Sequence, residues 1–305
     1  MKRYILILLL LFQCFTSNSQ TPQEVKISFT KEDVLKHLIV EIRGSVTDLE
    51  SLFNESQACQ LDSLIQEFER RTTIPIAVVT LNENHCDKSV FEDYTLKLAN
   101  NWSIGKKGED KGVLIGISKQ FRQMRIQNSN VIEKMISDEA TKKLIDDHFI
   151  PKFKENNYFE ATKAGLLALM QTLENKKKLQ TKAQDFTSDL IALIEHKEIT
   201  KLTQKIAENL YCGMCYPSAK SPNGISRKLF LKKYLNEVFD QELLRRLQRD
   251  ETQFFANSTD YGDCVIFYTT HRKDENGDNH EGAQFGFWLT EENGKLQLSG
   301  LETVP

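Results

Sequence analysis

The stretch SIGKKGEDKGVLIGISKQFRQMRI, residues 103–126, decides the fold of the first half of the chain. A basic loop with glycines leads through Glu109 and Asp110 into the apolar run Val113–Ser118, which is typical of a buried strand. A tight polar turn at 119–122 joins this run to a further strand at 124–127. The loop therefore either only connects two elements or holds a ligand at the mouth of a buried strand.

Apolar patterns on both sides of this stretch alternate between helix and strand. The predicted elements are a helix at 57–71, a strand at 74–81, a helix at 90–102 and, after the hairpin, helices at 138–149 and 157–173. The first of the later helices has Ser137 or Asp138 as its cap and stops before Pro151. This order predicts an α/β fold, namely a small three-layer α/β/α sandwich.

The second half of the chain has a different order of elements. The charged segment 174–184 has no apolar stripe, so it is either a linker or an exposed extension of the preceding helix. Residues 185–250 have helical patterns, and residues 262–301 have strand patterns. We therefore predict a first domain at 45–175, a linker at 176–184, and a smaller α+β domain at 185–305 with helices followed by an antiparallel strand meander.

The first nineteen residues have the pattern of a secretory signal peptide. Lys2 and Arg3 precede an apolar run, and Ser17 and Ser19 occupy the small positions before a predicted cut after Ser19. A lipoprotein interpretation would use Cys14, but the glutamine before it is too large for the usual motif. No other stretch is long and apolar enough to span a bilayer. We therefore expect an exported protein, periplasmic or secreted.

Charge gives no reason to expect a nucleic acid partner. The chain has 40 basic and 43 acidic residues, and removing the two basic residues of the leader leaves 38 against 43, a net charge near −5. Nucleic-acid-binding domains instead carry clustered positive charge. Composition alone names no protein partner.

Five cysteines follow the predicted leader, and in an oxidising compartment they can pair. Cys59 opens the first helix and Cys86 follows the first strand. Because that helix and strand run antiparallel, we predict a disulfide between them. Cys212 and Cys215 have the spacing of a redox pair, but they lie between helices, so a local disulfide or two buried thiols is the better interpretation. Cys264 remains as a core residue.

A set of spaced residues carries a family resemblance over about residues 45–173. These residues are Val46, Asp48, Ile104, Gly105, Lys106, Asp110, Gly112, Val113, Leu114, Arg122, Arg125, Ile126, Glu133, Ser137, Asp138, Pro151, Phe153, Tyr158, Ala161 and Gly165. In this order and spacing, the segment resembles the TPM domain family. The sequence departs from the family pattern at Ser129 and Val131, where the family usually has glycines. The C-terminal part looks like a nuclear-transport-factor-like cone fold.

The resemblance implies a divalent cation site, with calcium or magnesium held by loop carboxylates. The candidate ligands are Asp48, Asp110, Glu133 and Asp138. The alternative is structural, with Asp138 as a helix cap and Asp48 as a turn residue. Two functions stay open: an exported accessory or interaction protein with an unknown protein partner, and a metal-dependent acid phosphatase acting on phosphate monoesters. For the phosphatase, Asp110 or Asp48 would hold the metal that activates water.

Overall fold

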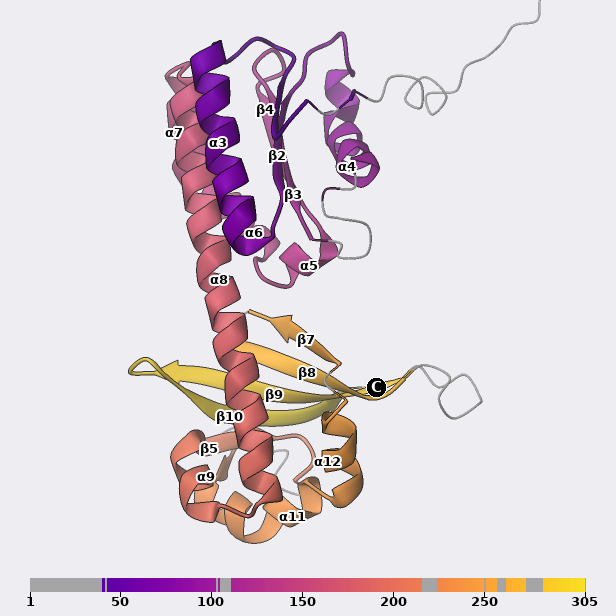
Figure 1. Cartoon of the computed structure of the whole chain (residues 1–305), viewed down its shortest axis with the longest axis vertical. Helices are drawn as coiled ribbons and strands as arrows, with labels where there is room; N and C mark the ends of the chain where they lie inside the picture. Colours follow the sequence, from indigo (N-terminus) through magenta and orange to yellow (C-terminus); the bar gives the residue numbers. More distant parts are fainter. Residues whose placement is uncertain are drawn as a thin grey trace, which may run out of the picture. The chain divides into compact units, whose positions relative to one another are not determined.

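The computed structural model describes residues 40–41, 43–102, 104, 111–215, 224–249, 251–256, 262–272 and 282–304 (Figure 1). The predicted signal peptide and Asp110 lie outside these residues. The described chain contains two sheets, and each sheet has its own hydrophobic core. No described helix is both long and apolar enough to cross a membrane.

The first sheet has four strands in the order β1-β2-β3-β4. The strands are β1 (Val46–Asp48), β2 (Ile76–Thr80), β3 (Val113–Ser118) and β4 (Gln123–Asn128). The first three are parallel, and β4 returns antiparallel to β3 through the predicted turn. Every residue of β2 and β3 is buried, as expected for strands that are covered on both faces.

Helices cover both faces of this sheet, as the sandwich prediction requires (Figure 1). On one face lie α3 (Glu55–Thr72) and the first half of α8 (Tyr158–Glu195), and on the other lies α4 (Phe91–Asn101). Gly116 of β3 faces α4, and a Cβ there would lie 2.5 Å from Cγ2 of Thr95. The glycine therefore lets α4 pack closely on the sheet.

Four short helical segments join β4 to α8. They are α5 (Asn130–Glu133), α6 (Asp138–Leu144), η3 (Ile145–Phe149) and α7 (Ile150–Lys154), of which η3 is a π-helical turn. Ser137 caps α6 by accepting the Ala140 N–H at 3.3 Å. The predicted stop before Pro151 is wrong. Pro151 lies in the first turn of α7, where its missing N–H costs little, so the helical path continues.

The long helix α8 has 38 residues and includes the charged segment 174–184. Of the two alternatives for that segment, the structure therefore shows the helical extension. Asn157 caps the helix by accepting the Glu160 N–H. The buried residues of α8 form two sets: the first set ends at Leu173 in the first core, and the second begins at Ala183 in the second core. The predicted boundary at 175 thus falls inside one continuous helix.

The second sheet has six strands in the order β6-β5-β10-β9-β8-β7. The strands are β5 (Ile206–Cys212), β6 (Ile225–Ser226), β7 (Thr252–Phe255), β8 (Cys264–His271), β9 (Ala283–Glu292) and β10 (Lys295–Val304). Strands β8, β9 and β10 form the predicted antiparallel meander. The helical prediction for the whole of 185–250 is wrong at β5, which pairs parallel with β10 and buries its apolar side chains against the sheet.

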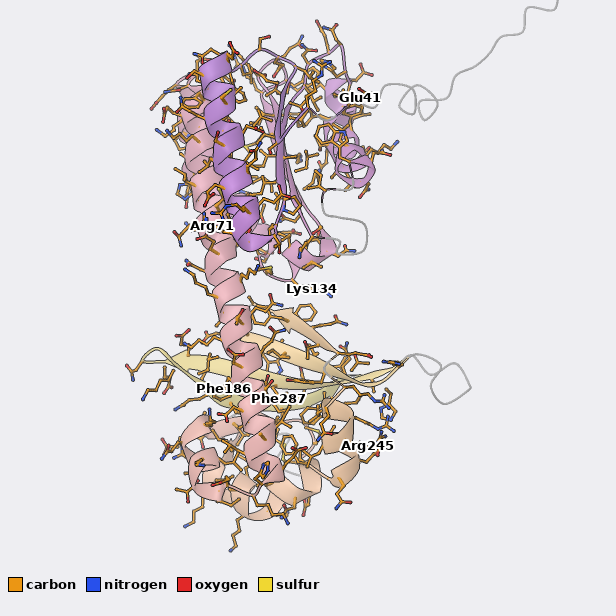
Figure 2. All side chains as sticks on the ribbon, in the orientation of Figure 1. Glu41, Arg71, Lys134, Phe186, Arg245 and Phe287 are labelled. Carbon is orange, nitrogen blue, oxygen red and sulfur yellow. A yellow bond between two sulfur atoms is a disulfide. The ribbon has the colours of Figure 1, made fainter. Side chains whose placement is uncertain are left out.

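The helices of this part lie against one face of the second sheet (Figure 1). They are the end of α8, α9 (Ile199–Lys205), α10 (Arg227–Leu229), η5 (Phe230–Tyr234), α11 (Leu235–Val238) and α12 (Gln241–Leu247). Phe230, Phe285 and Phe287 are fully buried in this core, and Figure 2 labels Phe287 on β9 and Phe186 on α8. The α+β order is confirmed, and the cone-like shape stays a prediction.

Candidate functional site

Asp48, the first predicted metal ligand, ends β1 and fixes the loop that follows it. Its carboxylate accepts the backbone N–H groups of Leu52 and Phe53 at 3.1 and 2.8 Å and the hydroxyl of Thr80 at 2.5 Å. Thr80 in turn accepts the N–H groups of residues 49 and 50 at 2.8 and 2.9 Å. These hydrogen bonds give Asp48 the structural role of a turn residue.

Two of the other predicted carboxylates, those of Glu133 and Asp138, lie at the opposite edge of the sheet. Glu133 and Asp138 are exposed in the segment after β4, whose last residue Asn128 pairs with Val113 at the start of β3. Asp48 lies at the carboxyl edge of the sheet, and a strand of six residues spans about 17 Å. Asp48 therefore cannot share an ion with Glu133 and Asp138. Within the described ranges, no three candidate ligands come together.

The end of the quoted loop has a clear structural role. A Cβ on Gly112 would lie 2.3 Å from the carbonyl oxygen of Ile104, so the close approach of these two backbones requires glycine. Ser129, which stands where the family usually has glycine, accepts the Gly112 N–H with its hydroxyl at 3.0 Å, and its own N–H donates to the Gly112 carbonyl. Ser129 thus fixes the end of the loop through a hydrogen bond from the Gly112 N–H to its side chain.

Two neighbouring pockets lie at the carboxyl edge of the sheet, and we call the two together the cavity and each of them a chamber. An apolar chamber of about 420 Å³ and a polar chamber of about 610 Å³ share Arg122, Asn156 and Tyr158. The other residues of the apolar chamber are Ile117, Ser118, Gln123, Met124, Ile150, Phe153 and Lys154. The other residues of the polar chamber are Glu50, Ser51, Leu52, Gln57, Asn82, Lys119, Gln120, Asn157 and Phe159. Ligands of open α/β sheets bind at this edge.

Arg122 is the central cation of the cavity. It ends the β3–β4 turn with φ of +53°, a left-handed conformation that is unusual for arginine, and its N–H donates to the Lys119 carbonyl at 3.3 Å. Among the described residues, its guanidinium has no hydrogen-bonded partner. By contrast, Arg125 on the following strand β4 donates to Glu92 at 2.8 Å. Within the described part of the chain, the five N–H donors of this exposed side chain can therefore bind a ligand.

Two further residues that line the polar chamber also have a left-handed backbone conformation. Ser51 in the β1–α3 loop and Asn156 before α8 have φ of +56° and +57°. Three of the six described non-glycine residues with positive φ thus line one cavity. Such strain gathers at sites where surrounding structure fixes a functional geometry, so this cavity is the strongest candidate site in the described chain.

Tyr158 lines both chambers. Its burial raises the pKa of the phenol, the Glu50 carboxylate raises it further, and Arg122 lowers it. The Glu50 carboxylate accepts the N–H groups of Lys119 and Gln120 at 2.8 and 3.1 Å, and the Lys119 ammonium lies 5.5 Å from the Tyr158 ring centre. Tyr158 therefore stays protonated at neutral pH and can donate a hydrogen bond to an anion.

The predicted disulfide between Cys59 and Cys86 does not form. Both are free thiols, Cys59 exposed and Cys86 buried. Cys59 lies on the outer side of α3, whose inward face carries Leu61 and Ile65, and Cys86 interacts with Tyr94 of α4 on the other face of the sheet. The two cysteines therefore lie on opposite faces of the sheet, Cys59 on α3 and Cys86 beside α4.

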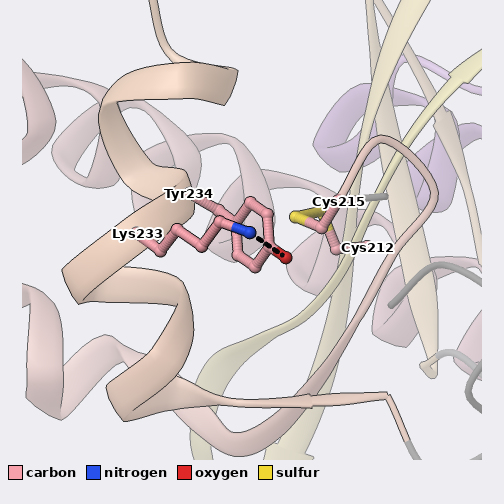
Figure 3. Close-up of a disulfide and its surroundings, with 4 residues drawn as sticks. All are labelled: Cys212, Cys215, Lys233 and Tyr234. Carbon is pink, nitrogen blue, oxygen red and sulfur yellow. Dashed lines mark hydrogen bonds between the residues drawn. A yellow bond between two sulfur atoms is a disulfide. The ribbon is translucent and has the colours of Figure 1, made fainter. Parts of the chain in front are cut away.

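Cys212 and Cys215 form the predicted local disulfide (Figure 3). Both cysteines are buried where β5 ends in a turn, with Cα atoms 5.3 Å apart. In Figure 3, the Lys233 ammonium donates to the Tyr234 hydroxyl beside the bond, at 3.0 Å. Because Cys212 is the last residue of β5, the pair follows a strand, and the prediction that it lies between helices is wrong.

Sequence reasoning missed the cavity because it weighed acidic residues as ligands. Arg122, Phe153 and Tyr158 were part of the family pattern, and this recurrence was the available signal. The sequence predicts both the turn at 119–122 and the helix that begins near 157, but it does not show that these two segments lie side by side around one cavity.

This arrangement defines an α/β sandwich domain with a cationic cavity at the carboxyl edge of its sheet. Residues 46–172 match the family model of the TPM domain, so this segment is a TPM domain. The N-terminal domain of a P. gingivalis protein, solved by NMR, is 29% identical over 43% of this chain and 82% of that chain, with a TM-score of 0.39.

Two other NMR structures have lower identity. The N-terminal domain of the cg2496 protein from Corynebacterium glutamicum is 15% identical over 43% of this chain and 81% of that chain, with a TM-score of 0.34. The BA42 protein from Bizionia argentinensis is 17% identical over 42% of this chain and 86% of that chain, with a TM-score of 0.37. Comparison with curated proteins gave no match.

Proposed function

We propose that this protein is an exported accessory protein whose TPM domain binds an anionic ligand in the cavity around Arg122. The observation that carries the proposal is a guanidinium in a cavity without a hydrogen-bonded partner among the described residues. Guanidinium groups bind carboxylates and phosphates through paired hydrogen bonds. Lys119 and Lys154 add positive charge, and Glu50 is already engaged by two backbone N–H groups.

The start of α8 also favours a negatively charged ligand. Tyr158 opens this helix of 38 residues and lines both chambers. The amino end of a helix has a partial positive charge, which favours anions. Export is supported by the leader pattern at 1–19 and by the disulfide at Cys212–Cys215, since disulfides persist in oxidising compartments. The ligand is then a periplasmic or extracellular anion, free or presented by a partner protein.

The test is binding of small anions to the full chain at low ionic strength. Calorimetry and thermal unfolding would be measured with methylphosphonate and with acetate. A ligand at ~100 times its Kd adds roughly 2.7 kcal/mol of stability. We expect Arg122→Gln to abolish the effect and Arg125→Gln to retain it, because Arg125 lies outside the cavity and pairs with Glu92. Equal effects in both variants, or none in the wild type, would refute the proposal.

Hydrolysis of phosphate monoesters is a second candidate. The matching family model carries phosphatase in its name, and an arginine beside a tyrosine hydroxyl suits a phosphate group. A calcium or magnesium ion would need Asp110, Glu133 and Asp138, and the described residues alone do not form such a site. Metal-dependent turnover of 4-nitrophenyl phosphate that is lost in Asp110→Asn would support it. Binding at Arg122 without turnover would leave only the accessory role.

A further inference from the structure

The two chambers of the cavity differ in chemistry and meet at one cation. Ile117, Met124 and Phe153 give the smaller chamber apolar walls, and two of them are nearly inaccessible, with Ile117 1% and Met124 6% exposed. The larger chamber is lined mostly by polar side chains. A molecule with its charge on Arg122 therefore has an apolar space on one side and a polar space on the other.

We propose that the ligand is a small organic anion, a carboxylate or phosphate, that carries an apolar group, and that this group occupies the chamber lined by Ile117, Met124, Ile150 and Phe153. The inference rests on the proposed anion binding and adds the chemical class of the ligand. An inorganic anion would fill only the junction at Arg122, whereas the apolar chamber alone measures about 420 Å³. That volume falls within the range of small-molecule sites.

The walls of this chamber are built to keep their shape. The Phe153 ring packs against Tyr158 with ring centres 4.9 Å apart and against Phe149 at 6.0 Å. Phe149 is itself fixed on Gly165, where a Cβ would come within 2.0 Å of its ring. A series of tilted aromatic rings therefore supports one wall of the chamber, and a wall that is already formed lowers the cost of binding.

Gln123 supplies a polar position within the same chamber. Its Oε1 atom is buried and has no hydrogen-bonded partner in the part of the chain that the structure describes. Buried polar atoms in folded proteins almost always have a partner. Because this atom has no exposed surface, the Gln123 side chain would have to turn before a donor group of the ligand could reach it.

The experiment compares matched anions on the full chain by calorimetry. Phenylphosphonate is set against methylphosphonate, phenylacetate against acetate, and benzyl alcohol serves as the uncharged ring. The P–C bond of the phosphonates avoids turnover. Burying a phenyl ring is expected to tighten binding by about tenfold or more. If phenylphosphonate binds more tightly than phenylacetate, the natural ligand is a phosphate; if phenylacetate binds more tightly, it is a carboxylate.

Three variants test whether the tighter binding of the phenyl anions depends on this cavity. Phe153→Ala should reduce the advantage of the phenyl anion over its methyl partner, Arg122→Gln should weaken both anions, and Arg125→Gln should change neither. Equal affinity of phenyl and methyl anions in the wild type overturns this inference and leaves anion binding intact, if that binding still depends on Arg122. Benzyl alcohol binding as tightly as the phenyl anions also overturns it. Absence of any dependence on Arg122 refutes both proposals. The wild-type comparison decides even if Phe153→Ala does not fold.

Discussion

Thr80 and Thr162 form a matched pair for testing how hydrogen bonds hold the carboxyl edge of the first sheet. Both side chains are fully buried. The Thr80 hydroxyl donates to Asp48 and accepts two backbone N–H groups, from residues 49 and 50. The Thr162 hydroxyl has no hydrogen-bonded partner among the described residues. Replacing each threonine with valine keeps the shape and removes only the hydroxyl.

The two substitutions are expected to change the free energy of unfolding by different amounts, and the two changes can differ in sign. Thr80→Val leaves two N–H donors without an acceptor, and each buried unsatisfied group costs about 1–3 kcal/mol. Because these donors are only partly buried, we expect a loss of about 2–3 kcal/mol in the free energy of unfolding. Thr162→Val removes a buried hydroxyl that gains nothing in the folded state, so we expect no loss or a small gain.

Tryptophan fluorescence during urea unfolding can follow the first sheet separately from the second sheet. The chain has two tryptophans, and Trp288→Phe leaves Trp102, whose indole N–H donates to the Val40 carbonyl at 2.7 Å. With a slope of ~2 kcal/mol/M, Thr80→Val should lower the midpoint by roughly 1–1.5 M. Equal shifts in the two variants would refute the reasoning, because they would show that the Thr162 hydroxyl makes a hydrogen bond of similar value.

Three further predictions concern single side chains. In the chain without residues 1–19 at pH 8, a disulfide-exchange reagent should modify only Cys59 in the folded state. Burial raises the pKa of the Cys86 thiol to about 11 and that of the Cys264 thiol to about 12, so these two should not react. If no thiol reacts in the folded state, the predicted Cys59–Cys86 disulfide would be supported instead. Gly165→Ala should lower stability by about 1–2 kcal/mol in thermal unfolding, because overpacking against Phe149 outweighs the helix gain of alanine, and a higher midpoint would contradict this. Glu50→Gln should lower the pKa of Tyr158 in an NMR titration, since the carboxylate raises it after burial does, and an unchanged pKa would count against the cavity geometry.

Elements with strong local periodicity could be predicted from the sequence. The buried strand Val113–Ser118 and the helix α3 were predicted closely because their apolar spacing reports burial directly. Strand β5 could not, because its pairing with β10 joins segments about ninety residues apart and its sequence also suits a helix end. The path through Pro151 was missed for a related reason: proline ends a helix interior but is tolerated in a first turn.

The candidate site was less predictable, because residue type does not state which groups a side chain already satisfies. Asp48, which was predicted as a ligand for a cation, stands at the carboxyl edge, and Glu50 follows two residues later. In the structure, both carboxylates accept backbone N–H groups of neighbouring loops and so hold the rim together. The guanidinium of Arg122, on a turn beside the same rim, has no hydrogen-bonded partner among the described residues. The carboxylates of this edge therefore hold the rim of the cavity together, and the proposed anion site rests on the arginine beside them.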